Sequence, residues 1–174
     1  KRMEEFLGEA YGREYGMKIA IARPYNAYGP RDNFDPASSH VMPALIKRIM
    51  DGENPLTVWG DGTPVREYTY AKDIARAFVW CLDNYDSEQI LHIGSTEEHS
   101  VRDVADMIAE IMGIDPDRKQ FDTTKPVAIS KKSSDNSKFL AISNFKYTPF
   151  EEGLKSSIEY FSANYDDPAK IKLV

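Results

Sequence analysis

The sequence predicts an α/β fold, because segments with helical periodicity alternate with short apolar segments typical of strands. Residues 1–15 place Met3, Phe6, Leu7 and Tyr11 three and four positions apart, on one face of a helix. Gly16 follows as a helix stop, and residues 17–23 then alternate apolar with small or polar side chains, as a strand does. The 174 residues are enough for one domain with a substantial core.

The same alternation continues to the end of the chain. We expect helices over residues 41–50, 72–84, 100–112 and 149–161, and short strands over residues 89–93 and 119–122. The apolar face of the second of these helices is expected to consist of Ile74, Ala75, Phe78, Val79 and Leu82.

Local signals predict three further features. Ser100 and Asp103 have the spacing of a capping box, and so do Thr148 and Glu151. Residues 56–59 and 65–70 flank an Asp-Gly pair, which suits a tight turn. These two segments are therefore predicted to form an antiparallel hairpin.

Composition disfavours several classes of protein. The net charge of −6 argues against a nucleic-acid partner, whose phosphates attract a basic surface. No apolar run approaches the ~20 residues that span a bilayer, so no membrane association is expected. A single cysteine makes neither an internal disulfide nor a cysteine-based metal site, which favours a cytoplasmic protein.

The pattern of the first residues bears on whether the chain is part of a longer protein. The helical pattern is already in phase at Lys1, without a capping residue and with two cations at the end of a helix that favours anions. We therefore expect the helix to begin upstream, in a longer protein of which this is the C-terminal part.

The loop over residues 23–31, Arg-Pro-Tyr-Asn-Ala-Tyr-Gly-Pro-Arg, is the densest cluster of special residues. It follows a predicted strand, which is where open α/β sheets bind ligands. Asn26 offers both donor and acceptor atoms. The alternative is a rigid connecting loop without a ligand.

Four other residues are candidates for chemistry. His40 lies at a loop–helix junction, and its ordinary pKa suits a general acid or base at neutral pH, although a structural role is the alternative. Arg48 and Arg66 are candidates for a phosphate clamp, with Trp59 available to stack on a base or sugar. The alternative is that both arginines are solvated surface charges that bind no ligand.

The remaining histidines and the cysteine are expected to be structural. His92 lies in an apolar strand, His99 lies in a polar loop, and the three histidines lack a metal-ligand spacing, so no metal is expected. Cys81 is expected to be a buried, inert thiol.

Several motifs together resemble the extended short-chain dehydrogenase/reductase superfamily of nucleotide-sugar epimerases, dehydratases and reductases. They are Arg-Pro-Tyr-Asn-Ala-Tyr-Gly-Pro at 23–30, Val-Trp-Gly-Asp-Gly-Thr-Pro-Val-Arg-Glu-Tyr at 58–68, Asp-Ile-Ala at 73–75 and Ile-Gly-Ser at 93–95. Within the superfamily, residues 32–36 and 39–46 are similar to the GDP-L-fucose synthase family.

The resemblance implies the C-terminal part of a Rossmann-type protein, with the last helix and strands of its parallel sheet and a small mixed α/β substrate-binding domain. Residues 1–33 would end the dinucleotide-binding domain. Residues 34–174 would form mainly the substrate-binding domain, with 72–112 returning to the Rossmann sheet. Residues 1–15 would pack against their copy in a homodimer.

The resemblance also implies roles for individual residues. Lys1 occupies the position of the catalytic Lys of a Tyr-x-x-x-Lys motif, and His40 that of the acid in a 3,5-epimerisation that precedes 4-reduction. The cofactor, NADP(H) with NAD(H) as the alternative, would contact Lys1, Pro24, Asn26 and Ala27. The nucleotide-diphosphate sugar would contact Asn26, His40, Val41, Leu45, Arg48, Trp59, Arg66 and Lys125.

Departures from the family pattern keep other functions open. Lys125-Pro126 is followed by Val127-Ala128 instead of Asp-Gly, and the next basic pair is Lys131-Lys132 instead of Arg-Lys. Another nucleotide-sugar epimerase, dehydratase or 4-reductase is therefore one alternative, and a non-catalytic binding module is another. The chain alone is expected to be inactive, because the catalytic Tyr would lie upstream.

Overall fold

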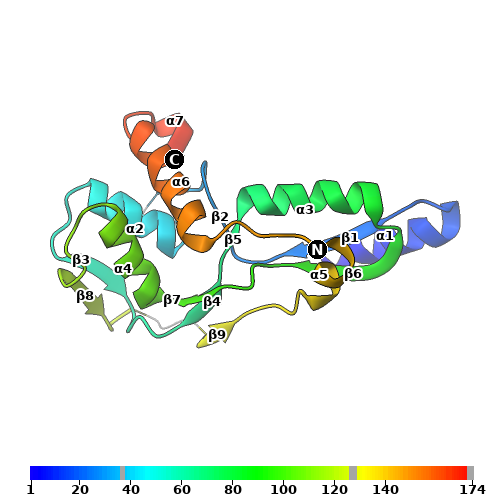
Figure 1. Cartoon of the computed structure of the whole chain (residues 1–174), viewed down its shortest axis with the longest axis horizontal. Helices are drawn as coiled ribbons and strands as arrows, with labels where there is room; N and C mark the ends of the chain where they lie inside the picture. Colours follow the sequence, from blue (N-terminus) through cyan, green and yellow to red (C-terminus); the bar gives the residue numbers. More distant parts are fainter. Residues whose placement is uncertain (36–37, 126–128, 172–174) are drawn as a thin grey trace.

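Two hydrophobic cores lie toward opposite ends of an elongated molecule in the computed structural model (Figure 1). The structure describes residues 1–35, 38–125 and 129–171. Among these residues, no helix is both long and apolar enough to cross a membrane.

The smaller core is built on a parallel pair of strands. β1 (Ala20–Pro24) pairs with β6 (Ser87–Ile93), with Ala22 opposite Leu91. The helix α3 (Ala71–Asn84) lies along one side of this pair and α5 (Ser137–Ser143) on the other (Figure 1). Helix α1 (Arg2–Tyr15) precedes β1 and ends at Gly16, which has a left-handed φ of 64° as the helix stop requires.

Of the face predicted for helix α3, Ile74 is buried in this core as expected, whereas the rest of that face is exposed. Phe78, Val79 and Leu82 are 39%, 58% and 81% exposed, whereas Ala77 and Cys81 are buried against the strands. Small side chains let the helix approach the sheet closely, so the face with less apolar bulk is the buried one. Cys81 is buried as expected, and burial raises the pKa of its thiol.

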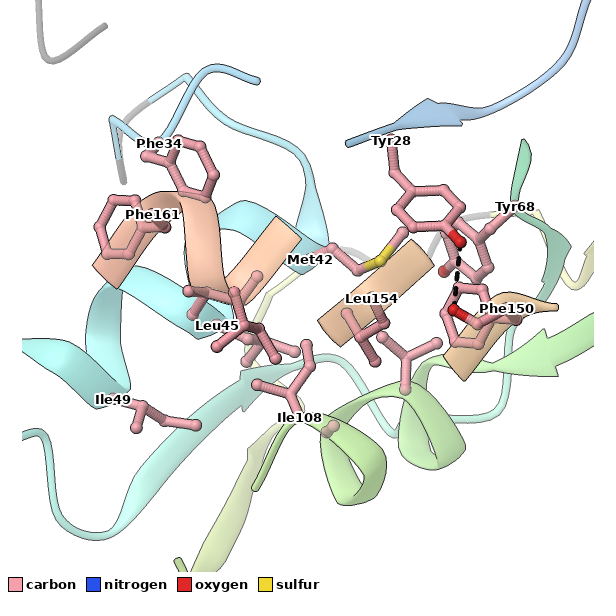
Figure 2. Packing of buried hydrophobic residues seen from close by; sticks show 14 of the residues in the cluster. Tyr28, Phe34, Met42, Leu45, Ile49, Tyr68, Ile108, Phe150, Leu154 and Phe161 are labelled. Carbon is pink, nitrogen blue, oxygen red and sulfur yellow. Dashed lines mark hydrogen bonds between the residues drawn. The ribbon is translucent and has the colours of Figure 1, made fainter. Parts of the chain in front are cut away.

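The larger core lies between three helices. These are α2 (Val41–Met50), α4 (Val101–Ile111) and α6 (Phe150–Ala163), and α7 (Pro168–Ile171) adds Ile171. Figure 2 shows Leu45 and Ile49 of α2 facing Ile108 of α4, and Phe34 stacking on Phe161 with ring centroids 4.2 Å apart.

Short strands connect the helices of this core. They are β2 (Ala27–Tyr28), β3 (Leu56–Trp59), β4 (Val65–Glu67), β5 (Thr69–Tyr70), β7 (Glu98–Ser100), β8 (Lys119–Asp122) and β9 (Lys131–Lys132). The strand prediction for residues 119–122 is confirmed.

The predicted hairpin is wrong. β3 pairs in parallel with β8, while β4 lies between antiparallel β7 and parallel β9. The Asp-Gly pair does bend the chain, with Gly62 at φ 79°, but the Gly62 carbonyl accepts a hydrogen bond from Arg102 at the start of α4. The turn therefore docks a helix and separates two sheets instead of joining two strands of one.

One predicted capping box is confirmed and the other is wrong. The Ser100 side chain and Asp103 make the reciprocal hydrogen bonds at the start of α4. At α6, by contrast, Thr148 donates both its N–H and its hydroxyl to Asp73 of α3, at 2.6 and 3.1 Å. A buried carboxylate is the stronger acceptor, so it takes the donors that a local cap would use.

The two cores meet where β2 pairs with β5. Ala27 lies opposite Thr69, and Tyr28 lies opposite Tyr70. The Tyr28 hydroxyl donates to the Phe150 carbonyl at 3.1 Å, as the dashed line in Figure 2 shows. The loop that follows β1 is thereby held against the strands and helices of the larger core.

Replacing Tyr68 with Phe is expected to make the fold less sensitive to alkaline pH. Burial raises the pKa of Tyr68 to about 12, above the ~10 of an unfolded tyrosine. A pKa raised on folding means that the stabilisation is complete below pH ~10 and is lost as pH rises toward ~12.

Between about pH 9 and about pH 11 the wild type should therefore lose about 1 kcal/mol more free energy of unfolding than Tyr68→Phe. Urea denaturation at both pH values measures this difference. Tyr15→Phe, at a position that is 67% exposed, is the control. Equal losses in wild type and Tyr68→Phe would contradict the expectation.

Candidate active-site pocket

A cavity of about 570 Å³ opens between the loop after β1, helix α2 and strands β3, β4 and β9. Its lining joins segments that are far apart in the sequence. The lining residues are Asn26, Ala27, Tyr28, Asp32, Ser39, His40, Val41, Met42, Pro43, Ala44, Leu45, Arg48, Trp59, Gly60, Pro64, Arg66, Tyr68, Val101 and Lys132.

Helix α2 runs along the pocket and sets its length. Ile46 and Ile49 point into the larger core, whereas Ala44 and Arg48 line the pocket. His40 is the N-cap residue, and Arg48 lies eight residues further on, about 12 Å along a helix with a rise of ~1.5 Å per residue. One helix therefore separates an imidazole from a guanidinium by a defined length.

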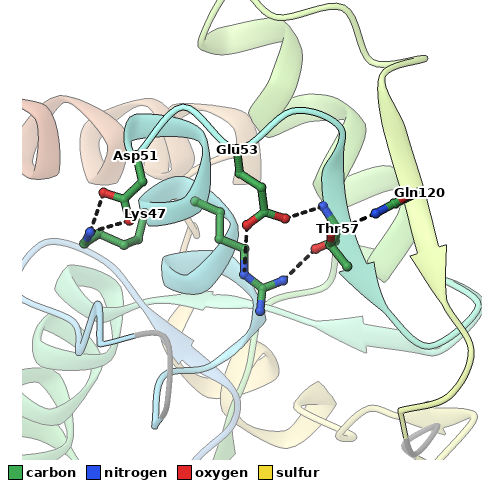
Figure 3. A network of polar contacts seen from close by, with 6 residues as sticks. Lys47, Asp51, Glu53, Thr57 and Gln120 are labelled. Atoms are coloured by element: carbon green, nitrogen blue, oxygen red, sulfur yellow. Dashed lines mark hydrogen bonds and ion pairs between the residues drawn. The ribbon is translucent and has the colours of Figure 1, made fainter.

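The far end of the pocket combines cations with an aromatic ring. Arg48 donates to the Thr57 carbonyl at 2.6 Å, and its Nε lies 3.9 Å from a carboxylate oxygen of Glu53. Figure 3 shows how Glu53 and Thr57 hold this group. The guanidinium lies 5.0 Å from the ring centroid of Trp59, which is 52% exposed. An exposed ring beside fixed cations suits a planar base next to phosphates.

Strand β4 contributes a second cationic pair. Pro64, Arg66 and Tyr68 alternate along the chain and all line the pocket. Arg66 lies opposite Lys132 of β9, so these two residues occupy the same face of the sheet. Guanidinium and ammonium groups on one face are suited to binding phosphoryl oxygens.

The near end of the pocket holds the residues suited to proton transfer and orientation. Asn26 adopts a positive φ of 36°, and its amide Nδ2 donates to the Glu67 carbonyl at 2.8 Å. The structure gives the His40 side chain no hydrogen bond to another described residue. The imidazole at this junction therefore has both ring nitrogens available to a ligand.

The structure brings together eight of the residues proposed from the sequence and leaves three outside the pocket lining. Asn26, Ala27, His40, Val41, Leu45, Arg48, Trp59 and Arg66 line it. Lys125 reaches only its rim, with Nζ 5.2 Å from the ring centroid of Trp59. Pro24 lies opposite Ile93 at the end of β1, and Lys1 is the N-cap residue of α1.

Sequence reasoning missed several of the lining residues. The alternation of Pro64, Arg66 and Tyr68 was a usable signal for a shared face. Lys132 could not be found in this way, because it reaches the pocket through the pairing of Arg66 with Lys132, two residues that are 66 positions apart in the sequence. Asp32, an acid inside this cationic pocket, was missed too.

The other two histidines have aromatic neighbours. His92 lies 5.4 Å from the Tyr25 ring centroid, and His99 stacks on Phe150 at 4.3 Å. The described part of the chain contains no group of three His, Cys, Asp or Glu side chains that would hold a metal ion.

Comparison with known proteins places these features in a family. Residues 1–94 match the NAD dependent epimerase/dehydratase family. A GDP-L-fucose synthase from Dictyostelium discoideum is 38% identical over 98% of this chain and 55% of its own length. The chain thus spans about half the length of the curated relatives it matches.

Solved structures show the same fold. A crystal structure of a GDP-L-fucose synthetase from Naegleria fowleri bound to NADP superposes with a TM-score of 0.87 at 34% identity, covering 96% of this chain and 53% of that one. A UDP-glucose 4-epimerase from Thermotoga maritima with UDP-glucose has a TM-score of 0.82 at 29% identity, covering 95% and 52%. The chain belongs to the NAD dependent epimerase/dehydratase family, and it matches the C-terminal part of these Rossmann-type proteins.

Proposed function

We propose that this chain is the substrate-binding part of a nucleotide-sugar 3,5-epimerase/4-reductase, which converts GDP-4-keto-6-deoxy-mannose to GDP-fucose with NADPH. The observation that carries the proposal is the single pocket that joins His40 and Asn26 at one end to Arg48, Trp59 and Arg66 at the other. Relatives named GDP-L-fucose synthase, at 30–38% identity, favour this substrate over other nucleotide sugars.

The cationic end of the pocket suits the nucleotide. Arg48, Arg66 and Lys132 would neutralise the diphosphate, and Trp59 would stack on the base. Lys125 would approach the nucleotide from the rim. Val41 and Leu45 would supply apolar contacts along α2. The sugar would then lie beside Asn26 and His40.

His40 would act as the acid of the epimerisation. A C4 ketone makes the hydrogens on C3 and C5 acidic, so a base can remove one as a proton and leave an enolate. His40 would return a proton to the same carbon from the opposite face, which inverts its configuration. The base and the catalytic Tyr would be contributed by a segment that precedes this chain, and we therefore expect the chain alone to be inactive.

The residues at the carboxyl ends of β1 and β6 fit a dinucleotide. Pro24 and Ile93 end these two parallel strands at one edge, which is where open α/β sheets bind cofactors. Pro24, Asn26 and Ala27 would contact the nicotinamide end of NADP(H), with NAD(H) as the alternative. Lys1 would hold the ribose and, as a cation beside the catalytic phenol, lower that phenol's pKa. The bound cofactor would supply the hydride for reduction at C4.

The remaining proposals concern organisation. We propose that residues 1–33 end the dinucleotide-binding domain, that residues 34–174 form mainly the substrate-binding domain, and that residues 72–112 contribute to the Rossmann sheet. The apolar stripe of α1 is exposed at Met3, Phe6, Leu7 and Tyr11, which supports a homodimer through this helix. The single, buried Cys81 favours a cytoplasmic location.

The 174-residue chain is expected to bind GDP, and Arg48→Ala is expected to weaken this binding about tenfold. A hydrogen bond from a guanidinium to a phosphate contributes about 1.5–3 kcal/mol, and a tenfold change corresponds to about 1.4 kcal/mol. Isothermal titration calorimetry with GDP, UDP and dTDP measures the affinities.

Arg118→Ala is the control, because Arg118 is 63% exposed and lies outside the pocket lining. Preference for UDP or dTDP would replace the fucose assignment with another nucleotide-sugar enzyme. Absence of nucleotide binding would contradict the proposed function.

In a longer protein that includes this chain and consumes NADPH, His40→Asn is expected to impair epimerisation more than reduction. Removing a general acid costs about 10²–10⁴ in rate. Deuterium incorporation at C3 and C5 from heavy water reports epimerisation, and nicotinamide absorbance reports reduction. His92→Asn makes the same change outside the pocket. Deuterium incorporation at C3 and C5 at the wild-type rate would show that His40 is not the epimerisation acid.

Phe6→Glu is expected to convert a self-associating chain into a monomer, because it places a charge in the exposed apolar stripe of α1. Sedimentation equilibrium measures the mass of each variant. Leu82→Glu introduces the same charge on α3, at a position that is 81% exposed, and should leave association unchanged. A monomeric wild type would rule out this interface.

A further inference from the structure

We propose that Glu67 is a positioning residue for the pocket: its buried carboxylate fixes strand β9 so that Lys132 faces the bound diphosphate. The inference rests on the proposed function, because it assumes that a nucleoside diphosphate occupies the pocket. Glu67 itself is absent from the pocket lining, so its effect on binding acts through other residues.

Glu67 is a buried carboxylate, and among the described residues both of its hydrogen-bond donors belong to one residue. It is 2% exposed, and its two oxygens accept the N–H and the hydroxyl of Ser134, each at 2.6 Å. Ser134 follows Lys132 by two positions, so these bonds tie the chain directly after β9 to β4. A buried charge is costly unless it is hydrogen-bonded, which makes this two-point attachment specific.

The Glu67 carboxylate packs directly against the backbone of Gly94, where no side chain would fit. A methyl group at Gly94 would overlap Oε1 of Glu67 and the hydroxyl of Ser134. The Gly94 carbonyl in turn accepts a hydrogen bond from Asn136. The end of β6 and the segment after β9 therefore close around the same side chain.

Strand alternation puts Glu67 and Arg66 on opposite faces of β4. Arg66 faces the pocket together with its partner Lys132, whereas Glu67 faces away. β9 spans only Lys131–Lys132, and two residues of ladder are a weak attachment by themselves (Figure 1). The Glu67–Ser134 bonds add a buried attachment to this short strand, whose other side-chain tie, the ion pair of Lys131 with Glu98, is exposed.

Glu67 also contacts a second pocket residue, Asn26, through its backbone. Its carbonyl accepts the amide of Asn26 at 2.8 Å. One residue of β4 thus positions Asn26 through its main chain and Lys132 through its side chain. A Gln side chain at this position would keep the volume of Glu67. Its amide nitrogen, however, would be a hydrogen-bond donor that faces a donor of Ser134.

The test is a double-mutant cycle between Glu67→Gln and Lys132→Ala, measured as GDP affinity of the 174-residue chain by calorimetry. We expect Glu67→Gln to weaken binding about tenfold in the wild-type background, which corresponds to loss of one charged contact. In the Lys132→Ala background we expect it to weaken binding less than about twofold, because the contact is already gone.

Glu98→Gln is the matched control. Glu98 lies directly opposite Glu67 in the sheet but pairs with Lys131, at 2.7 Å, which is not part of the pocket lining. It should leave GDP affinity unchanged in both backgrounds. Thermal melts show whether each variant folds, and Ser134→Ala, which removes only the hydroxyl donor, is the second variant if Glu67→Gln does not fold.

Equal weakening in both backgrounds would overturn the inference, since a general loss of structure does not depend on Lys132. The inference is also overturned if Glu67→Gln and Ser134→Ala both leave the GDP affinity unchanged. If the wild-type chain binds no GDP, the proposed function fails, and the positioning role of Glu67 is then tested by comparing amide hydrogen exchange of Glu67→Gln with that of the wild type. Faster exchange over residues 129–134 in the variant, with unchanged exchange over α6, would support the role. Unchanged exchange over residues 129–134 would overturn it.

Discussion

The pairing of β2 with β5 is the constraint on which the rest of the structure depends. It is only two residues long on each strand, yet it is where the loop after β1 meets the larger core. Tyr28 strengthens it by donating to the Phe150 carbonyl from inside the core, and Asn26 does so by donating to the Glu67 carbonyl. Because these bonds are buried or partly buried, breaking one leaves a polar group without a partner. Without this junction, the loop that carries Asn26 would not be held against α2 and β4, which line the rest of the pocket.

A few carboxylates carry much of the remaining organisation. Asp73, 1% exposed, accepts two hydrogen bonds from Thr148 and one from Arg76, which ties α3 of the smaller core to the start of α6 in the larger one. Glu97 accepts the Phe150 N–H at that same helix start. Acidic side chains thus connect secondary-structure elements to one another, whereas the basic side chains Arg48, Arg66 and Lys132 line the pocket. This separation of charge explains how a chain of net charge −6 presents a cationic site.

Sequence reasoning succeeded where the determining interaction is local and failed where it is distant. Helix α2, the left-handed stop at Gly16 and the capping box at Ser100 depend on neighbours within one or two turns, and all three are confirmed. The hairpin prediction assumed that adjacent strands pair, but β3 and β4 each find partners more than thirty residues away. The face of α3 was misjudged for a related reason: periodicity identifies apolar stripes, while only the sheet decides which stripe it covers.

The sequence by itself determined the order of the longer helices, the family and eight of the residues that line the pocket, because motifs and periodicity are properties of contiguous segments. The tertiary structure alone decided how those residues combine. It joined Arg48 to Trp59 at one end, brought Lys132 beside Arg66, and placed Lys1 and Pro24 outside the pocket lining. The physical reason is that strand pairing and helix packing are long-range contacts. Their partners are selected by the burial of complementary surfaces, which no local pattern encodes.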